Sequence, residues 1–294
     1  MAHQAHRLTG TAPPDEARLR RFARLATPLL GGHAVQGVGP RSARDRAGAG
    51  LEFLDLRAYA PGEDIRHIDW RQSARRGRTL IRRYRDESAA DWYLAVDGSA
   101  SMALGRKWPF AVELGLGFAY ALLQAGHRVS LLVFDDRVRV RVAAGRGSRQ
   151  FATLVRELRR FEPLPRGGAS LPGVCTAHMR RSGNLMLISD LLREDAMAAD
   201  LRRLRASVAG AEVIQVLARD EADPAAVGPA LLRDVESGER RPLTLSPATI
   251  VAARERLDRH GERLRAITVG LGMRFSRCRD DGDWERTLLT HLGA

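Results

Sequence analysis

The sequence is poor in cysteine and almost without lysine. Its 294 residues include only two cysteines, Cys175 and Cys278, which lie far apart. This number and spacing match neither a disulfide framework nor a zinc site, so both are expected to be small core residues in a reducing compartment. Lys107 is the only lysine, and arginine therefore supplies nearly all of the basic side chains.

Long apolar runs are also scarce. The N-terminal segment has no apolar stretch of the signal-peptide kind, which favours a cytoplasmic protein. Residues 108–126 approach the roughly 20 apolar residues that a membrane span needs. However, they contain Glu113 and Gln124 and lie between strand-like segments. We expect a buried helix there and no membrane segment.

Aromatic residues make up only 5% of a chain whose formal net charge is +13. The charge alone fits nucleic-acid binding. No aromatic platform and no recognised nucleic-acid motif accompany it, and many arginines alternate with acids, as in residues 254–259. A solvated, arginine-rich surface is the favoured interpretation, and nucleic-acid binding through that surface is kept as the alternative.

The motifs of common enzyme classes are missing as well. The sequence has no G-x-x-x-x-G-K-[ST] loop, no G-x-S-x-G elbow and no H-E-x-x-H pair, and its eight histidines are scattered. We therefore expect a protein that is not an enzyme. Acids at strand ends that hold magnesium for phosphoryl transfer are the remaining enzymatic alternative.

What the sequence does contain is a regular alternation of strand-like and helix-like segments after residue 90. Apolar strands are predicted at 92–96, 127–134, 184–189 and 212–218, with helices between them, one of them ending near Arg181. This alternation predicts an α/β fold with a doubly wound, mainly parallel sheet of the Rossmann type. A β-hairpin insertion is expected near 231–246.

Three regions are expected along the chain. Residues 1–46 are predicted to form a mobile tail and one helix, because they combine a Pro-Pro pair, a short amphipathic stretch and a glycine-rich run. Residues 47–90 are predicted to form a small β-rich unit, and residues 91–294 the main α/β domain.

Acids end three of the predicted strands, and one of them begins a loop with a distinctive pattern. These acids are Asp97, the pair at 135–136, and Asp190, and the loop is Asp97-Gly98-Ser99-Ala100-Ser101. The carboxyl ends of parallel strands meet at one edge of a sheet. Carboxylate and hydroxyl oxygens are hard ligands that suit Mg²⁺, with Asp190 acting mainly through water. The alternative is that Asp97 and the hydroxyls only cap the following helix.

The D-x-S-x-S loop resembles the metal-ion-dependent adhesion site (MIDAS) of von Willebrand factor type A domains. Segments outside the loop extend the resemblance to bacterial proteins grouped as domain of unknown function 58, over residues 47–294. Upstream these are Gly50-Leu51-Glu52-Phe53, Arg57-Ala58-Tyr59, Pro61-Gly62-Glu63-Asp64, Arg66-His67-Ile68-Asp69-Trp70 and Ser73-Ala74-Arg75. Downstream they are Asp97 to Met102, Phe134-Asp135-Asp136, Ile188-Ser189-Asp190 and Glu236-Ser237-Gly238-Glu239.

The resemblance implies a von Willebrand A-like domain and a non-enzymatic, protein-binding adaptor. Such proteins are often encoded beside a MoxR-type AAA+ ATPase and work with it in chaperone-like assembly or metal insertion. In this interpretation an acidic side chain of the partner completes the metal coordination. Some relatives carry membrane helices, whereas a soluble version is expected here.

One position departs from the family pattern. The family places a threonine in a Gly-Gly-Thr context, and this chain has Gly167-Gly168-Ala169-Ser170. Ala169 has no side-chain oxygen, so one metal ligand is missing unless Ser170 or a water replaces it. We expect a degenerate site with lowered magnesium affinity.

The motif of the small N-terminal unit has two interpretations. Its charged residues could form a patch that recognises a partner, or an ion-pair network that clasps the unit to the main domain. The second is favoured because clustered charges that become buried must be paired. Two aromatic residues would then be packing anchors. The residues concerned are Arg57, Tyr59, Asp64, Arg66, Asp69, Trp70 and Arg75.

Overall fold

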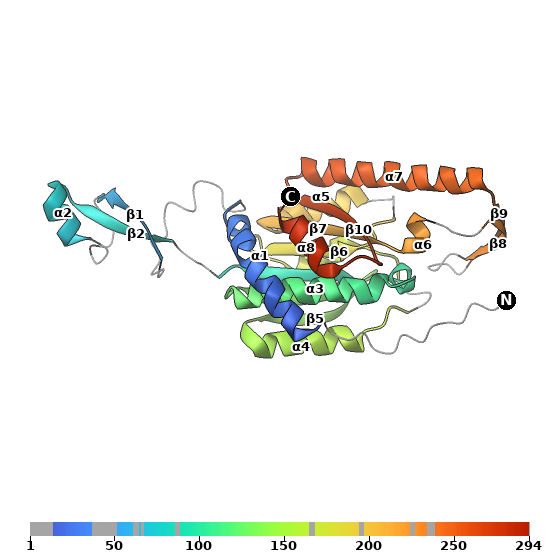
Figure 1. The fold of residues 1–294 in the computed structure, drawn as a ribbon, viewed down its shortest axis with the longest axis horizontal. Helices are drawn as coiled ribbons and strands as arrows, with labels where there is room; N and C mark the ends of the chain where they lie inside the picture. Colours follow the sequence, from blue (N-terminus) through green and yellow to red (C-terminus); the bar gives the residue numbers. More distant parts are fainter. Residues whose placement is uncertain are drawn as a thin grey trace. The chain divides into compact units, whose positions relative to one another are not determined.

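The computed structural model describes residues 14–36, 52–60, 65, 68–85, 89–164, 168–193, 197–223, 227–233 and 239–293. The chain forms two compact units (Figure 1). One consists of Met1–Gly37 together with Ala90–Ala294, and the other of Val38–Ala89. The small unit is therefore an insertion between the first helix and the first strand of the larger one.

A six-stranded sheet forms the centre of the larger unit. Its strand order is β10-β7-β6-β3-β4-β5, with five parallel strands and an antiparallel edge strand, β5. The predicted α/β class and mainly parallel sheet are thus confirmed. The strands are β3 (Asp91–Asp97), β4 (Arg128–Phe134), β5 (Val138–Gly145), β6 (Asn184–Ser189), β7 (Gly210–Leu217) and β10 (Arg274–Arg279).

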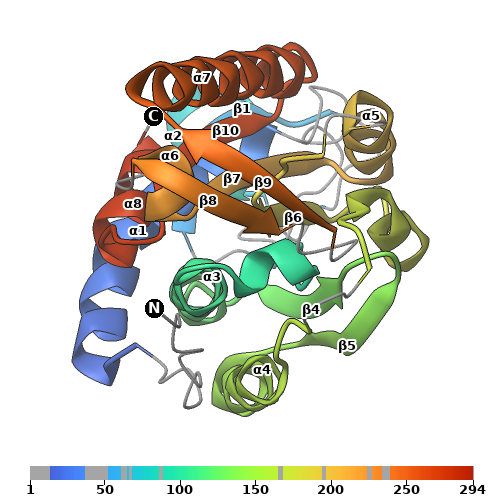
Figure 2. The ribbon, with the colours of Figure 1, turned by 90° about the vertical axis from the view of Figure 1, so that its right-hand side faces the viewer.

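Two hydrophobic cores cover the two faces of this sheet, because the central strands are buried on both sides. The first core packs four helices on one face: α1 (Glu16–Gln36), α3 (Lys107–Gln124), α4 (Gly147–Arg160) and α8 (Trp284–Gly293). The second packs α5 (Met197–Ser207) and α7 (Pro247–Gly270) on the other face (Figure 2).

Helix α1 lies in the core of the larger unit. Phe22 and Leu30 are buried, and the Phe22 ring contacts the edge of Trp284 in α8 at 5.5 Å. Arg21 donates hydrogen bonds to Glu285 at 2.5 and 2.7 Å, so an ion pair reinforces this contact between the two ends of the chain. The helix predicted within residues 1–46 therefore belongs structurally with the main domain.

Short elements complete the larger unit. They are the 3-10 helices η2 (Ala100–Ala103) and η3 (Pro172–His178), the one-turn helix α6 (Arg219–Ala222), and a hairpin of β8 (Gly228–Arg233) with β9 (Arg240–Leu245). The hairpin lies where the sequence predicts an insertion and begins a few residues earlier. The helix expected to end near Arg181 is instead the 3-10 helix η3.

The smaller unit contains an antiparallel pair, β1 (Glu52–Ala58) and β2 (Leu80–Arg85), and the helix α2 (Trp70–Arg76). Asp69 caps α2 by accepting a hydrogen bond from Gln72 N at 3.0 Å. Within the part of the chain that the structure describes, no helix is long and apolar enough to cross a membrane.

Candidate functional site at the carboxyl edge of the sheet

The sheet places Asp97 and Asp190 beside each other at its topological switch point. Strand β3 pairs with β4 on one side and β6 on the other, so the chain reverses its direction of winding at β3. Val96 pairs with Ile188, which puts the ends of β3 and β6 level with one another. The carboxyl ends of strands at such a point are the usual ligand-binding edge of an open α/β sheet.

The Asp97 carboxylate is fully buried and accepts three hydrogen bonds. Oδ1 accepts from Ser99 N at 2.8 Å, and Oδ2 accepts from the hydroxyls of Ser170 and Ser189, each at 2.5 Å. Ser99 and Ser101 lie next to this group, with their Oγ atoms 3.1 Å apart. The structure thus brings Asp97, Ser99, Ser101 and Ser170 together, as the sequence pattern requires of one site.

Burial raises the pKa of Asp97 to about 6, and the nearby negative charge of Asp190 adds to the shift. The hydrogen bonds from Ser170, Ser189 and Ser99 N act in the opposite direction, since they favour the ionised carboxylate. Desolvation of Asp97 therefore outweighs the hydrogen bonds that favour its ionised form.

Two further features fix the loops around Asp97. The ring of Phe161 lies so close to Gly98 that a Cβ there would be 2.5 Å from it, so position 98 admits only glycine without a shift. After β6, Leu191 has a φ of 50°, a conformation that is rare for a branched side chain. Leu191 N donates to Ser189 Oγ at 3.1 Å, and the Leu191 carbonyl lies 2.7 Å from His260 Nε2. Backbone strain of this kind is concentrated at functional sites.

Lys107 reaches the site from the first turn of α3. Its ammonium donates to Asp190 Oδ2 at 2.9 Å and to Glu221 Oε1 at 2.8 Å, and its side chain is completely buried. Burial alone lowers the pKa of this ammonium, but the two carboxylates outweigh burial and raise it. The only lysine of the chain is therefore a fixed positive charge beside the second carboxylate of the candidate site.

The remaining strand-end acids have structural partners. Asp135 accepts hydrogen bonds from Arg139 Nε at 2.6 Å and from Arg137 N at 3.1 Å, so it does not join the cluster around Asp97. The Asp135 carbonyl accepts from Leu171 N at 3.0 Å and so holds the loop that carries Ser170. At the end of β10, Asp280 accepts from the backbone N–H groups of Arg106 and Arg219 and ties α3 to α6.

The oxygen donors of the site fit a magnesium ion in type. Octahedral Mg²⁺ with bonds of about 2.1 Å places neighbouring ligand oxygens about 3 Å apart, and Ser99 Oγ and Ser101 Oγ are 3.1 Å apart. The charges fit less well, because Lys107 already holds one oxygen of Asp190. Among the described residues no group of three or more His, Cys, Asp or Glu side chains could hold a metal ion. Ala169 supplies no ligand, as the sequence indicates.

Sequence reasoning missed two members of this site. Ser189 ends an otherwise apolar strand, and a hydroxyl at that position was the available signal. Lys107 was visible only as the one lysine in an arginine-rich chain, and nothing nearby in the sequence pairs it with Asp190 or Glu221, which are 83 and 114 residues away.

The motif residues of the small unit lie partly outside the described residues, as Asp64 and Arg66 do. Asp69 is buried and caps α2, whereas Arg57 and Arg75 are exposed. Tyr59 N donates to the Thr79 carbonyl at 2.9 Å. Trp70 is 68% exposed, and its expected role as a packing anchor stays a prediction. Whether the motif serves a partner or clasps the unit stays a prediction.

Comparison with known families gives one decisive match. The profile of the family described as "Protein of unknown function DUF58" matches residues 55–267, which is well over half of the chain. The chain belongs to the DUF58 family. Curated relatives of this DUF58 protein include the uncharacterised protein Rv1480 of Mycobacterium tuberculosis and Mb1516 of Mycobacterium bovis. Each is 28% identical over 247 residues, or 81% of this chain and 77% of the relative.

Similar solved structures include the conserved hypothetical protein BatB from Bacteroides thetaiotaomicron and an aerotolerance-related membrane protein from Bacteroides fragilis. The first has a TM-score of 0.43 and 13% identity and covers 70% of this chain and 98% of that one. The second has a TM-score of 0.41 and 14% identity and covers 70% and 97%.

Proposed function

We propose that this DUF58 protein is a non-enzymatic adaptor that binds a partner protein through the carboxyl edge of a von Willebrand A-like domain. The observation that carries the proposal is the position of the D-x-S-x-S loop: Asp97, Ser99 and Ser101 lie at the switch point of the sheet, beside Asp190. By family analogy the partner is a MoxR-type AAA+ ATPase engaged in chaperone-like assembly.

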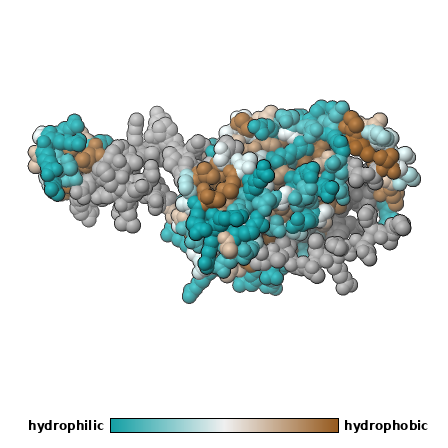
Figure 3. All heavy atoms as spheres, viewed as in Figure 1, coloured by the Kyte–Doolittle hydropathy of each residue, from teal (hydrophilic) through white to brown (hydrophobic). Residues whose placement is uncertain are grey.

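Exposed apolar side chains around this edge support a binding role. Leu104 follows η2 and Leu164 follows α4, and both flank loops of the site. Four more lie on or beside the hairpin and at the start of α7, which Figure 3 shows as a cluster of apolar residues. These are Val227, Leu231, Leu243 and Val251, each 41% to 66% exposed. Large clusters of exposed apolar side chains are rare on monomeric proteins and are typical of protein-binding surfaces.

In this proposal the site binds magnesium with low affinity. The hydroxyls of Ser99 and Ser101 would hold the ion directly, with Asp97 and Asp190 acting through water and Ser170 available as the substitute ligand. The ion would offer a coordination position to an acidic side chain of the partner. The Lys107–Asp190 ion pair and the alanine at position 169 both lower the expected affinity.

Two alternatives receive less support. A magnesium-dependent phosphoryl-transfer enzyme needs a base or nucleophile near the acids, and the Asp97 oxygens are taken up by hydroxyl and backbone donors. Nucleic-acid binding needs free arginines, and many described arginines pair with acids, including Arg18 with Asp283 and Arg277 with Asp258.

The test is a nuclease-treated pull-down from the native cell, in magnesium and in chelator, with identification by mass spectrometry. Ser101→Ala removes one proposed ligand that lies at the partly exposed rim of the site. Leu231→Asp interrupts the apolar surface on the hairpin, and Arg202→Glu on the exposed side of α5 is the matched control.

We expect the wild type and Arg202→Glu to recover an AAA+ ATPase, and Leu231→Asp to lose it. Chelator or Ser101→Ala should reduce the amount of ATPase recovered. Recovery that is insensitive to chelator and to Ser101→Ala would keep the adaptor role and remove the metal. Recovery of nucleic-acid-associated proteins alone, or recovery unchanged by Leu231→Asp, would contradict the proposed surface.

A further inference from the structure

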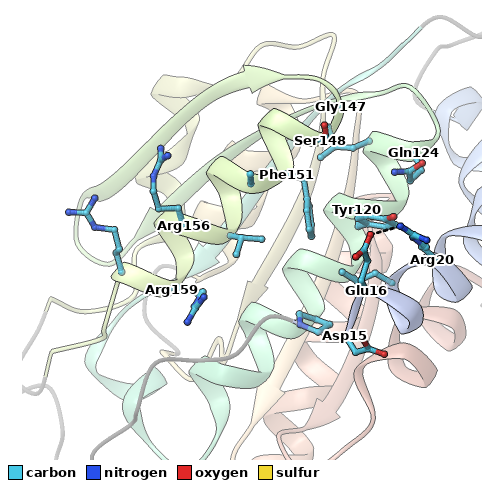
Figure 4. Close-up of a pocket in the computed structure, with 16 residues that line it drawn as sticks. Asp15, Glu16, Arg20, Tyr120, Gln124, Gly147, Ser148, Phe151, Arg156 and Arg159 are labelled. Carbon is cyan, nitrogen blue, oxygen red and sulfur yellow. Dashed lines mark hydrogen bonds and ion pairs between the residues drawn. The ribbon is translucent and has the colours of Figure 1, made fainter.

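A groove of about 1050 Å³ lies on the helical face of the larger unit, between α1 and α4 and over α3 (Figure 4). It is separate from the strand-end loops, since its lining comes from α1, α3 and α4 and from the two residues before α1. Its floor is apolar, and the rings of Tyr120 and Phe151 meet there edge to face at 5.0 Å. Leu19, Leu123, Ala152 and Val155 complete the apolar lining.

The two walls of the groove differ in charge. On the α1 wall, Arg20 donates to Glu16 at 2.6 Å, so these two charges neutralise one another. The α4 wall carries Arg156, Arg159 and Arg160. Arg156 pairs with Glu157, whereas Arg159 and Arg160 are exposed and form no ion pair with another described residue. The α4 wall therefore presents positive charge that the described protein does not neutralise.

The dimensions favour a helix as the occupant. The lining extends along α4 from Gly147 to Arg160, which corresponds to about 20 Å at 1.5 Å per residue. A trough of this length, open along one side and walled by two helices, resembles a helix-in-groove site more than an enclosing small-molecule pocket. A helix laid on Tyr120 and Phe151 would pack as an additional helix of the same layer.

The chain's own N-terminal segment is a poor occupant on charge. Residues 1–13 lead directly into Pro14 and Asp15 at the groove, but they contain Arg7 and two histidines and no acid. A basic segment would add positive charge next to the α4 wall. The complementary occupant has an apolar stripe for the floor and acidic residues on the flank that faces α4.

We propose that this groove binds an amphipathic helix of a partner protein whose flank facing α4 is acidic. The proposal does not depend on the function assigned to the strand-end site. It rests on the apolar floor, the length of the groove and the charge difference between its walls.

The test uses two synthetic helical peptides of about 18 residues, long enough to span the groove. Both carry the same leucine stripe at i, i+3, i+4 and i+7 positions, and one has glutamates and the other lysines on the same flank. Binding to the full-length protein is measured by fluorescence anisotropy at two salt concentrations. We expect the acidic peptide to bind about tenfold more tightly than the basic one, with the preference shrinking in high salt.

Charge reversal on the α4 wall gives the decisive comparison. Arg156→Glu with Arg159→Glu should reverse the preference, so that the basic peptide binds better. The control is Arg202→Glu with Arg265→Glu, which makes the same charge change on exposed positions of α5 and α7 and should leave the preference intact. Val155→Asp should weaken both peptides, because it places a charge on the apolar floor.

Equal binding of the two peptides, binding of neither, or a preference that follows net charge and changes equally in the control would each overturn the proposal. A variant pair that lowers the melting temperature without moving the peptide preference would also overturn it. The arginines would then serve only to stabilise the last turn of α4.

Discussion

At the scale of single residues, the site is defined by the buried carboxylate of Asp97. The cost of removing its charge from water exceeds what its hydrogen bonds give back. Among the described residues no cation hydrogen-bonds to Asp97, and its raised pKa follows mainly from burial. The buried ammonium of Lys107 is hydrogen-bonded to Asp190 and Glu221 instead. One carboxylate of the site is thus neutralised by the protein, and the other is not.

This difference predicts a pH dependence of stability. A folded-state pKa raised from 3.8 to about 6 means that Asp97 stabilises the fold while it is protonated, and that this contribution is lost as pH rises through about 6. Asp97→Asn cannot titrate. In chelator, the unfolding free energy of the wild type should fall relative to this variant by about 2.4 kcal/mol between pH 4 and pH 7. Urea unfolding of both proteins checks this, and parallel pH profiles would show that Asp97 is not perturbed.

Lys107 gives a second prediction. Lys107→Met removes the charge but keeps the length of the side chain, and leaves Asp190 and Glu221 without their shared cation. The unfolding free energy should drop by about 3 to 5 kcal/mol. Lys107→Arg should also destabilise, because a planar guanidinium with five donors does not fit between two carboxylates arranged around an ammonium.

A double variant separates this role from a simple loss of packing. Asp190→Asn added to Lys107→Met should recover part of the lost stability in urea unfolding, since one of the two uncompensated charges is gone. If the two losses instead add, the ion pair between these residues is not what Lys107 contributes.

The sequence predicted one part of the site and not the other, for a physical reason. The D-x-S-x-S loop is local, so spacing alone places Ser99 and Ser101 near Asp97. The contacts of Ser189 and Lys107 are made between segments that only the strand order brings together.

At the scale of elements, strand and helix patterns predicted the larger unit well, because its central strands are apolar on both faces. The long apolar segment 108–126 is the buried helix α3, as expected. The close packing of α3 depends on a glycine. A Cβ at Gly117 would lie 2.5 Å from the ring of Trp284, so only glycine lets this ring approach so closely. That contact between α3 and α8 cannot be read from either segment alone.

Two elements differ from their predictions. The residues of one favour a different helix type, and the position of the other depends on packing against distant segments. The segment Pro172–His178 forms a 3-10 helix, in which Pro172 and Gly173 replace ordinary helix formers and the Asp200 side chain packs tightly against Gly173. Helix α1 was expected beside a mobile tail, but its apolar face meets α3 and α8 in the core. Its partners lie as far as 265 residues away, as the Arg18–Asp283 bond shows.

At the scale of the whole molecule, the small unit is inserted into a larger one that is complete without it. The larger unit takes residues from both sides of the insertion, and each unit forms a compact set of contacts. Replacing residues 38–89 by a flexible Gly/Ser segment of about 20 residues, with a root-mean-square span of roughly 25 Å, should leave the larger unit folded. Its melting temperature should change by less than about 4 °C.

The matched control for this prediction is removal of residues 14–36, which takes Phe22 and Leu30 out of the core and should lower the melting temperature much further. Calorimetry or circular dichroism on the three proteins is sufficient. A protein that loses its cooperative transition when only the insertion is replaced would show that the two units do not fold independently.

The contact between the first and last helices also has a consequence for biosynthesis. Helix α1 leaves the ribosome long before Trp284 and Glu285, which cover Phe22 and pair with Arg21, are translated. At roughly 5 to 20 residues per second, the intervening chain takes about 13 to 50 s to synthesise. During that time α3 can shelter the apolar face of α1, but α8 cannot. Helix α1 is therefore open to chaperones and proteases until α8 has been made, and a premature stop that removes α8 acts on a helix made much earlier.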